Sequence, residues 1–158
     1  MVVAAAVLGE TEVCRSTSSP SLSKDRSEIT ERVLREYKVI VSVGLSSNPA
    51  RPSFGVCAYL KEHGYRIIPV NPNEKEVLGE KAYPDLDAVP DKIEVVQIFR
   101  RPEAVPEVVE AAIRRGAKVV WMQDGAGNPE AARRAEAAGL TAVVNDCMMR
   151  RHRQLGLE

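Results

Sequence analysis

The stretch from Val39 to Gly55 has the residue types of an anion-binding site. β-Branched residues with a single serine among them predict a buried strand, and the chain then changes to V-G-L-S-S-N-P-A-R-P-S-F-G. Gly44 permits a tight turn directly after the strand, and Ser53 stands where it could cap a following helix. Such a loop presents backbone N–H groups and a positive dipole end to one point, so we expect a phosphate or another anion there.

The side chains of this loop fit the same chemistry. Ser46, Ser47 and Ser53 supply hydroxyl donors, and Arg51 can offer a forked cation to a diphosphate. The alternative is a stiff connection with a solvated arginine. The loop has neither the G-x-G-x-x-G spacing of a dinucleotide fingerprint nor the G-K-[ST] ending of a triphosphate loop.

Two further expected strands end in residues that bear on the ligand. Asn71 and Pro72 follow the second strand, where a nicotinamide dinucleotide protein would usually place an acidic residue. Asn71 could bind a ligand or equally cap the turn. Arg100 and Arg101 follow the third strand and could neutralise a phosphate or stack on adenine, or could be solvated or paired with nearby acids.

The fourth expected strand ends at Gln123 and Gly125, which are further site candidates. Trp121 and Met122 within that strand are expected to pack in the core. Cys147 is expected to be a small buried residue, since no motif ties a histidine to it. The sequence shows no recognisable acid-base pair, metal cluster or catalytic triad.

The composition indicates a soluble cytoplasmic protein. Lys and Arg number 22, Asp and Glu number 22, and aromatic residues make up 4% of the 158 residues, which argues against a nucleic-acid partner. The three cysteines form no disulfide or zinc pattern. No apolar run is long enough for a bilayer, and Met1 to Leu8 lacks the features of a secretory signal. The protein could act alone or as a homodimer.

The strands and helices that would position these residues alternate along the chain. We expect a mobile extension over residues 1–26 and one domain over 27–158. The fold class is α/β: a three-layer, Rossmann-like open sheet, mainly parallel, with about five strands and helices on both faces. The expected strands cover 39–43, 65–70, 93–99, 118–122 and 140–144. The expected helices cover 30–38, 54–63, 103–115 and 128–138, with a short basic helix after 147.

Five ordered blocks between Tyr37 and Cys147 resemble a known family. They are V-G-L-S-S-N-P-A-R-P-S-F-G-V, G-Y-R-I-I-P-V-N-P, G-E-K-A-Y-P-D-L, F-R-R-P-E-A-V-P and G-A-K-V-V-W-M-Q-D-G. This combination resembles the small CoA-binding proteins, which are single-domain relatives of the CoA-binding domain in the succinyl-CoA synthetase alpha subunit.

The resemblance implies that coenzyme A is bound by its ADP portion, as free CoA or acyl-CoA. It places Gly44, Leu45, Ser46, Arg51, Pro52, Ser53 and Gly55 in the diphosphate loop, and Val70, Asn71 and Pro72 beside the nucleotide. It also places Phe99, Arg100 and Arg101 against adenine or the ribose phosphate, and Gln123 and Gly125 on the pantetheine side.

Two departures from the family pattern affect the expected function. Asn145-Asp146-Cys147 stands where the family commonly has Asp-Arg-Cys, and the phosphorylated histidine loop of the synthetase is not recognisable. The second departure removes the reason to expect ligase activity. We therefore expect a non-catalytic carrier, sensor or regulator; the alternatives are a nucleotide-cofactor-dependent oxidoreductase or transferase and, as a lesser reading, a protein-interaction module.

Overall fold

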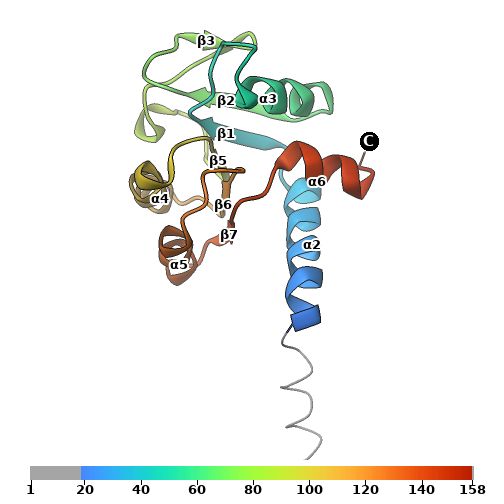
Figure 1. Ribbon diagram of the computed structural model, residues 1–158. Helices are drawn as coiled ribbons and strands as arrows, with labels where there is room; N and C mark the ends of the chain where they lie inside the picture. Colours follow the sequence, from blue (N-terminus) through green and yellow to red (C-terminus); the bar gives the residue numbers. More distant parts are fainter. Residues whose placement is uncertain (1–18, 158) are drawn as a thin grey trace, which may run out of the picture.

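A computed structural model of the protein describes residues 19–157 and shows the expected three-layer α/β fold (Figure 1). A five-stranded sheet lies at its centre with the order β2-β1-β5-β6-β7, and every pairing between neighbouring strands is parallel. Its strands are β1 (Val39–Val43), β2 (Arg66–Val70), β5 (Val95–Ile98), β6 (Val119–Met122) and β7 (Thr141–Val143).

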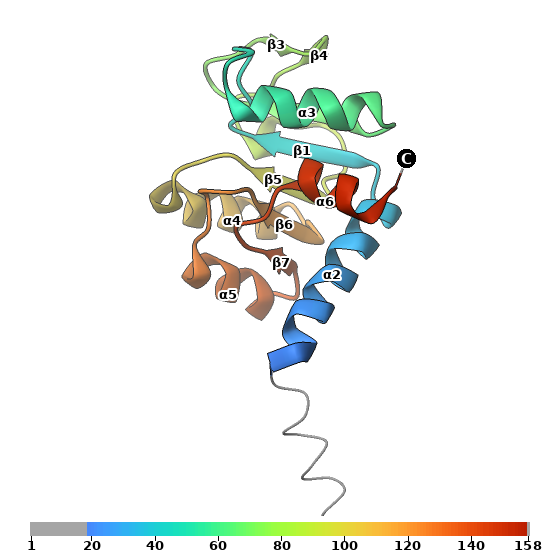
Figure 2. The ribbon, with the colours of Figure 1, turned by 45° about the vertical axis from the view of Figure 1, so that its right-hand side comes forward.

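Helices cover both faces of this sheet (Figures 1 and 2). One face carries α4 (Val105–Arg114) and α5 (Pro129–Ala137). The other carries α2 (Ser19–Glu36), α3 (Pro52–Glu62) and α6 (Met148–Leu155). The start of α5 follows its sequence signal: Asn128 caps the helix by accepting a hydrogen bond from Ala131 N at 3.0 Å, and Pro129 occupies the first turn.

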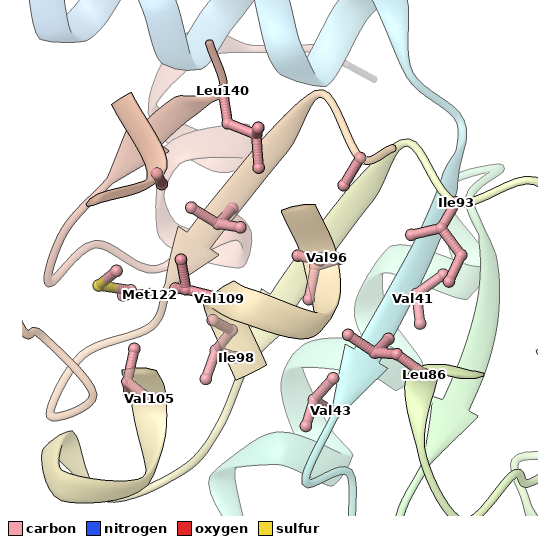
Figure 3. Close-up of a cluster of buried hydrophobic side chains, with 14 of the residues drawn as sticks. Val41, Val43, Leu86, Ile93, Val96, Ile98, Val105, Val109, Met122 and Leu140 are labelled. Atoms are coloured by element: carbon pink, nitrogen blue, oxygen red, sulfur yellow. The ribbon is translucent and has the colours of Figure 1, made fainter. Parts of the chain in front are cut away.

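Each sheet face has its own apolar core. On the α4 and α5 side, Val96, Ile98 and Met122 of the sheet pack against helical residues such as Val105 and Val109 (Figure 3). On the opposite side, Trp121 is fully buried among α2, α3 and α6, and its Nε1 donates to the backbone oxygen of Asp146 at 2.8 Å. The prediction that Trp121 and Met122 are core residues is confirmed.

The order of strand addition reverses between β1 and β5, which makes this position the topological switch point of the sheet. From β1 the chain adds β2 on one side, and from β5 onward it adds strands on the other side. The carboxyl ends of β1 and β5 therefore lie beside each other, while the connections that follow them diverge to opposite faces. In open α/β sheets, ligands bind in the crevice at such a switch point.

The segment from Glu74 to Pro90, expected to be loop with short elements, contains a small antiparallel hairpin. Its strands are β3 (Glu76–Val77) and β4 (Glu80–Lys81), and a single turn of 3-10 helix, η1 (Leu86–Ala88), follows. Tyr83 then forms a parallel bridge with Val70 at the outer edge of β2. Tyr83 N donates to Pro69 O at 3.0 Å, so the segment after the hairpin covers the sheet edge at which Pro69 cannot donate a hydrogen bond.

Helix α2 begins at Ser19, ahead of both the helix start expected at residue 30 and the domain start expected at residue 27. Pro20 lies in its first turn, where a proline removes no helical hydrogen bond, and the helix continues into the packed residues Val33 and Leu34. Part of the stretch assigned to a mobile extension is therefore helical; residues 1–18 lie outside the described residues. No helix within 19–157 combines the length and the apolar character needed to cross a bilayer.

Candidate functional site

A cleft of about 540 Å³ opens at the carboxyl ends of the central strands, at the switch point of the sheet. It is lined by Gly44, Ser46, Arg51, Pro52 and Ser53 after β1; Asn71, Asn73 and Glu74 after β2; Phe99, Arg100, Arg101 and Pro102 after β5; and Asp124, Gly125 and Ala126 after β6. Most of the residues predicted from the sequence therefore come together in one place.

Gly44 forms the floor of this cleft and fits only without a side chain. Its φ is +91°, and a Cβ placed on it would lie 2.3 Å from the backbone oxygen of Phe99. Gly44 N donates to Val70 O at 2.8 Å, and Phe99 N donates to Val43 O at 2.8 Å. Gly44 thus allows the ends of β1, β2 and β5 to meet at contact distance.

The loop after β1 is held by its own side chains, which changes the expected picture of an open N–H cradle. Ser46 N donates to Ser53 Oγ at 3.2 Å, Asn48 N donates to Ser46 Oγ at 3.1 Å, and Ala50 N donates to Asn48 Oδ1 at 2.9 Å. Ser47 N donates to a carboxylate oxygen of Glu74 at 2.8 Å. The backbone donors of this loop are therefore largely satisfied within the protein.

The prediction that Ser53 caps the following helix is wrong. The N-cap of α3 is Arg51, in extended conformation and without a side-chain hydrogen bond, and Pro52 occupies the first helical position. Ser53 lies inside the first turn, where its buried hydroxyl accepts from Ser46 N. The serine holds the loop against the helix instead of closing the helix end.

Three arginines supply the positive charge of the cleft. Arg51, Arg100 and Arg101 all line it, and they also line an adjoining hollow of about 600 Å³ beside Glu103, Ala104 and Glu107. Among the side chains described for residues 26–157, no hydrogen bond or ion pair joins the guanidinium group of any of the three to another residue. Several other arginines are paired, as Arg114 is with Asp87 at 2.7 Å and Arg134 with Glu110 at 2.7 Å.

A smaller and more apolar pocket of about 230 Å³ adjoins the cleft through Arg100. Val70 and Pro72, both predicted from the sequence, lie in its wall. The remaining lining residues are Val43, Pro84, Asp85, Leu86, Ala104, Glu107, Val108 and Ala111. The pocket therefore combines aliphatic walls with two carboxylates, a composition that could hold a flat, partly polar group.

Asn71 is bonded to the protein at both ends of its amide. Its Nδ2 donates to Leu45 O at 3.1 Å, and its Oδ1 accepts from Asn73 N at 2.9 Å. Of the two roles left open by the sequence, the structure shows the turn-forming one, in a residue that also lines the cleft. Asn71 thereby ties the loop after β2 to the loop after β1.

Three predicted residues line neither the cleft nor the smaller pocket. Leu45 is fully buried in the core between the sheet and α3, and Gln123 is 3% exposed. Gln123 Oε1 accepts from Gln97 Nε2 and from Met148 N, both at 3.1 Å. Gly55 is exposed on α3, and a Cβ placed on it would meet no atom within 4 Å.

Gln123 belongs to a buried polar network that the sequence did not reveal. Ser42 donates to Gln97 Oε1 at 2.6 Å, and Cys57 donates to Ser42 Oγ at 3.4 Å. Burial raises the pKa of the Cys57 thiol to about 12, so Cys57 is protonated and weakly nucleophilic at neutral pH. Cys147 is also buried, as expected. The network joins the middle of the sheet to the start of α6.

The departure at Asn145-Asp146-Cys147 corresponds to an ion-pair cluster on the α6 side. The buried carboxylate of Asp146 accepts from Arg150 at 3.1 Å and from Arg151 at 2.8 Å. Arg150 also pairs with Asp124 at 2.6 Å, and this pairing lowers the pKa of Asp124. Asp124 lies on the rim of the cleft, so α6 is anchored to the cleft wall by this pair.

Sequence reasoning missed several lining residues of both hollows. Glu74 and Glu107 come from connections whose path depends on packing, and no motif around them indicated a site. Asp124 lies between the predicted residues Gln123 and Gly125, at a strand end that was expected to contribute to the site. Asp85 and Leu86 were more accessible to prediction, because they lie in the block G-E-K-A-Y-P-D-L that carried the family resemblance. They lie in a segment that was expected to be loop with short elements, and their place in the site was not recognised.

The parallel sheet order and a cleft at its switch point define the class: a doubly wound α/β protein with a ligand-type cleft at the strand ends. Within that class, residues 38–153 match the CoA binding domain family, and the chain belongs to this family.

Several known proteins are similar to this chain. YneT of Bacillus subtilis, named as an uncharacterized protein, is 39% identical over 127 residues, which are 80% of this chain and 93% of YneT. A solved structure of a hypothetical protein from Pyrococcus horikoshii OT3 is 50% identical, with a TM-score of 0.79, and covers 82% of this chain and 91% of that one. ADP-forming acetate–CoA ligase II of Archaeoglobus fulgidus is 32% identical over 83 residues, which are 51% of this chain and 12% of the ligase.

Proposed function

We propose that this protein binds coenzyme A or an acyl-CoA through its ADP and diphosphate portion, without catalysing a reaction, as a carrier, sensor or regulator. The observation that carries the proposal is the convergence of Arg51, Arg100 and Arg101 on one cleft at the switch point. Among the side chains described for residues 26–157, these guanidinium groups have no carboxylate partner. Unpaired guanidinium groups facing one hollow favour a ligand with several negative charges.

The adjoining hollows fit the parts of such a ligand. The arginine-lined cleft suits the diphosphate, and the pocket of about 230 Å³ beside Val70 and Leu86 suits the adenine ring. The carboxylates of Asp85 and Glu107 in that pocket can accept from the adenine amino group. Family membership supports the same ligand.

Two groups with shifted pKa values, Asp124 at the cleft and Cys57 in the core, favour binding over catalysis. Arg150 lowers the pKa of Asp124 at the rim, which makes this carboxylate a weak general base. Cys57 stays protonated at neutral pH because burial raises the pKa of its thiol. These two groups therefore give little support to the alternative of an oxidoreductase or transferase.

Calorimetric titration with CoA, dephospho-CoA, NAD and NADP tests the proposal. We expect saturable binding of CoA, weaker binding of dephospho-CoA because it lacks the 3′-phosphate, and much weaker binding of NAD, since Asn71 stands where a ribose-binding acid would lie. No heat of binding with CoA at millimolar concentration would refute the proposal. Tighter binding of NAD or NADP than of CoA would favour the oxidoreductase alternative.

Gly55→Ala separates the role of this glycine in the protein from its role toward the ligand. Because Gly55 lies within α3 with open space around its Cα, alanine should raise the free energy of unfolding by about 0.5 to 1 kcal/mol. If the diphosphate packs against α3 there, the same variant should bind CoA several-fold more weakly. Thermal unfolding and calorimetry measure the two effects, and unchanged CoA affinity would remove Gly55 from the site.

A further inference from the structure

A carboxylate of the protein occupies the position in the loop where an anion was expected. Glu74 Oε2 accepts from Ser47 N at 2.8 Å and from Ser47 Oγ at 3.0 Å. One oxygen thus receives a backbone N–H and a hydroxyl from the same residue. This is the pair of donors that a loop after the first strand would offer to a phosphate oxygen.

The contact can be released without loss of the connection between the two loops. Asn71 Nδ2 donates to Leu45 O at 3.1 Å, and this second link joins the same loops closer to the strand ends. Ser47 is exposed and Glu74 is only half-buried, so neither is held by core packing. Glu74 could therefore leave Ser47 while the floor of the cleft stays in place.

Glu74 shares its cleft with the three unpaired arginines yet pairs with none of them. It lines the same hollow as Arg51, Arg100 and Arg101, and no ion pair joins it to any of the three among the described residues. Its negative charge is instead stabilised by Ser47. A polyanionic ligand in this cleft would be attracted by the three arginines and repelled by the carboxylate of Glu74, which already accepts from Ser47 N and Ser47 Oγ.

We propose that Glu74 is an internal competitor for the anion position at Ser47, and that a phosphate oxygen of the ligand displaces it. The proposal rests on the binding of CoA in this cleft and adds a residue that sets its affinity. Displacement has a cost, because charge-assisted hydrogen bonds of a carboxylate are stronger than neutral ones. Glu74 therefore weakens binding and favours ligands with enough phosphate charge to replace it.

Calorimetric titration of CoA with four forms of the full chain tests this role: wild type, Glu74→Gln, Glu74→Asp and Glu76→Gln. Glutamine removes the charge but keeps an acceptor, whereas aspartate keeps the charge but is too short for the same contact. Glu76 lies nearby on β3 and is exposed, so Glu76→Gln controls for net charge. We expect both Glu74 variants to bind CoA about fivefold to twentyfold more tightly, and Glu76→Gln to change affinity less than twofold.

The outcomes separate this inference from the proposed function. If the wild type binds CoA and the Glu74 variants bind it equally or more weakly, Glu74 organises the loop and the inference is overturned, while CoA binding stands. If only Glu74→Gln binds more tightly, long-range repulsion explains the effect and direct competition is overturned. If no form binds CoA, the proposed function fails and this inference fails with it. Binding by the Glu74 variants alone would support competition in its strongest form.

Discussion

Replacing Arg51, Arg100 and Arg101 together with glutamine is expected to weaken CoA binding by about a thousandfold. Each arginine lines the cleft, and none has a carboxylate partner within the part of the chain that the structure describes. A charge-assisted hydrogen bond contributes about 1.5 to 3 kcal/mol, so losing three should remove most of the diphosphate affinity even if their effects add incompletely. The single variant Arg51→Ala should lose about 1 to 3 kcal/mol.

The same triple variant should leave stability almost unchanged, because the three side chains make no ion pair that folding would lose. A matched control replaces Arg26, Arg32 and Arg133 with glutamine, because these three arginines are also exposed but lie on α2 and α5, away from the cleft. Calorimetry at low and high salt measures affinity, and urea unfolding measures stability. Loss of affinity in the control to the same extent would mean that net charge, and not the cleft, attracts the ligand. Full affinity in the triple variant would place CoA elsewhere.

The parallel sheet could be predicted from sequence because its strands are buried on both faces. Residues such as Val41, Val96 and Val120 are fully buried, and a strand covered by helices on both sides must be apolar throughout. Turn signals then bounded each run, as Gly44 does after β1 and Gly139 does before β7. Strand positions could be predicted because the apolar run and the glycine that bounds it lie in the same short segment.

Contacts between segments far apart in the chain could not be predicted from local sequence patterns. Ser47 meets Glu74 across 27 positions in the chain, and Ser42 meets Gln97 across 55. Serine, glutamine and glutamate are common in loops and on surfaces, so their types alone do not reveal such partners. The β3–β4 hairpin escaped for a related reason, since its two-residue strands are too short to show an alternating pattern.

The arginines show how prediction of a site depends on the fold. From sequence, Arg100 and Arg101 could bind a ligand, be solvated or pair with nearby acids, because two adjacent arginines give the same pattern in all three cases. The strand order determines where these arginines lie. Because β5 pairs with β1, Phe99 lies beside Gly44, and the two arginines line the same cleft as Arg51. Proximity in the cleft therefore follows from topology.

Replacing Gly44 with alanine is expected to lower the free energy of unfolding by about 2 to 5 kcal/mol. Two costs add at this position. A φ of +91° is unfavourable for a residue with a side chain, at about 1 to 2 kcal/mol, and the new Cβ would lie 2.3 Å from a backbone oxygen of Phe99. That oxygen belongs to a strand end and cannot rotate away, so β1 and β5 must separate, at a further 1 to 3 kcal/mol.

Gly64→Ala provides the matched control for this experiment. Gly64 has a nearly identical φ of +93°, but a Cβ there would meet no atom within 4 Å. The difference between the two variants in urea unfolding therefore isolates the cost of forcing β1 and β5 apart. Because separation would also widen the cleft and move Arg100, whose Cδ lies 3.1 Å from the added Cβ, Gly44→Ala should weaken CoA binding while Gly64→Ala should not. Equal loss of unfolding free energy in both variants would show that the positive φ alone sets the cost at Gly44, and that the contact of the added Cβ with Phe99 O contributes nothing.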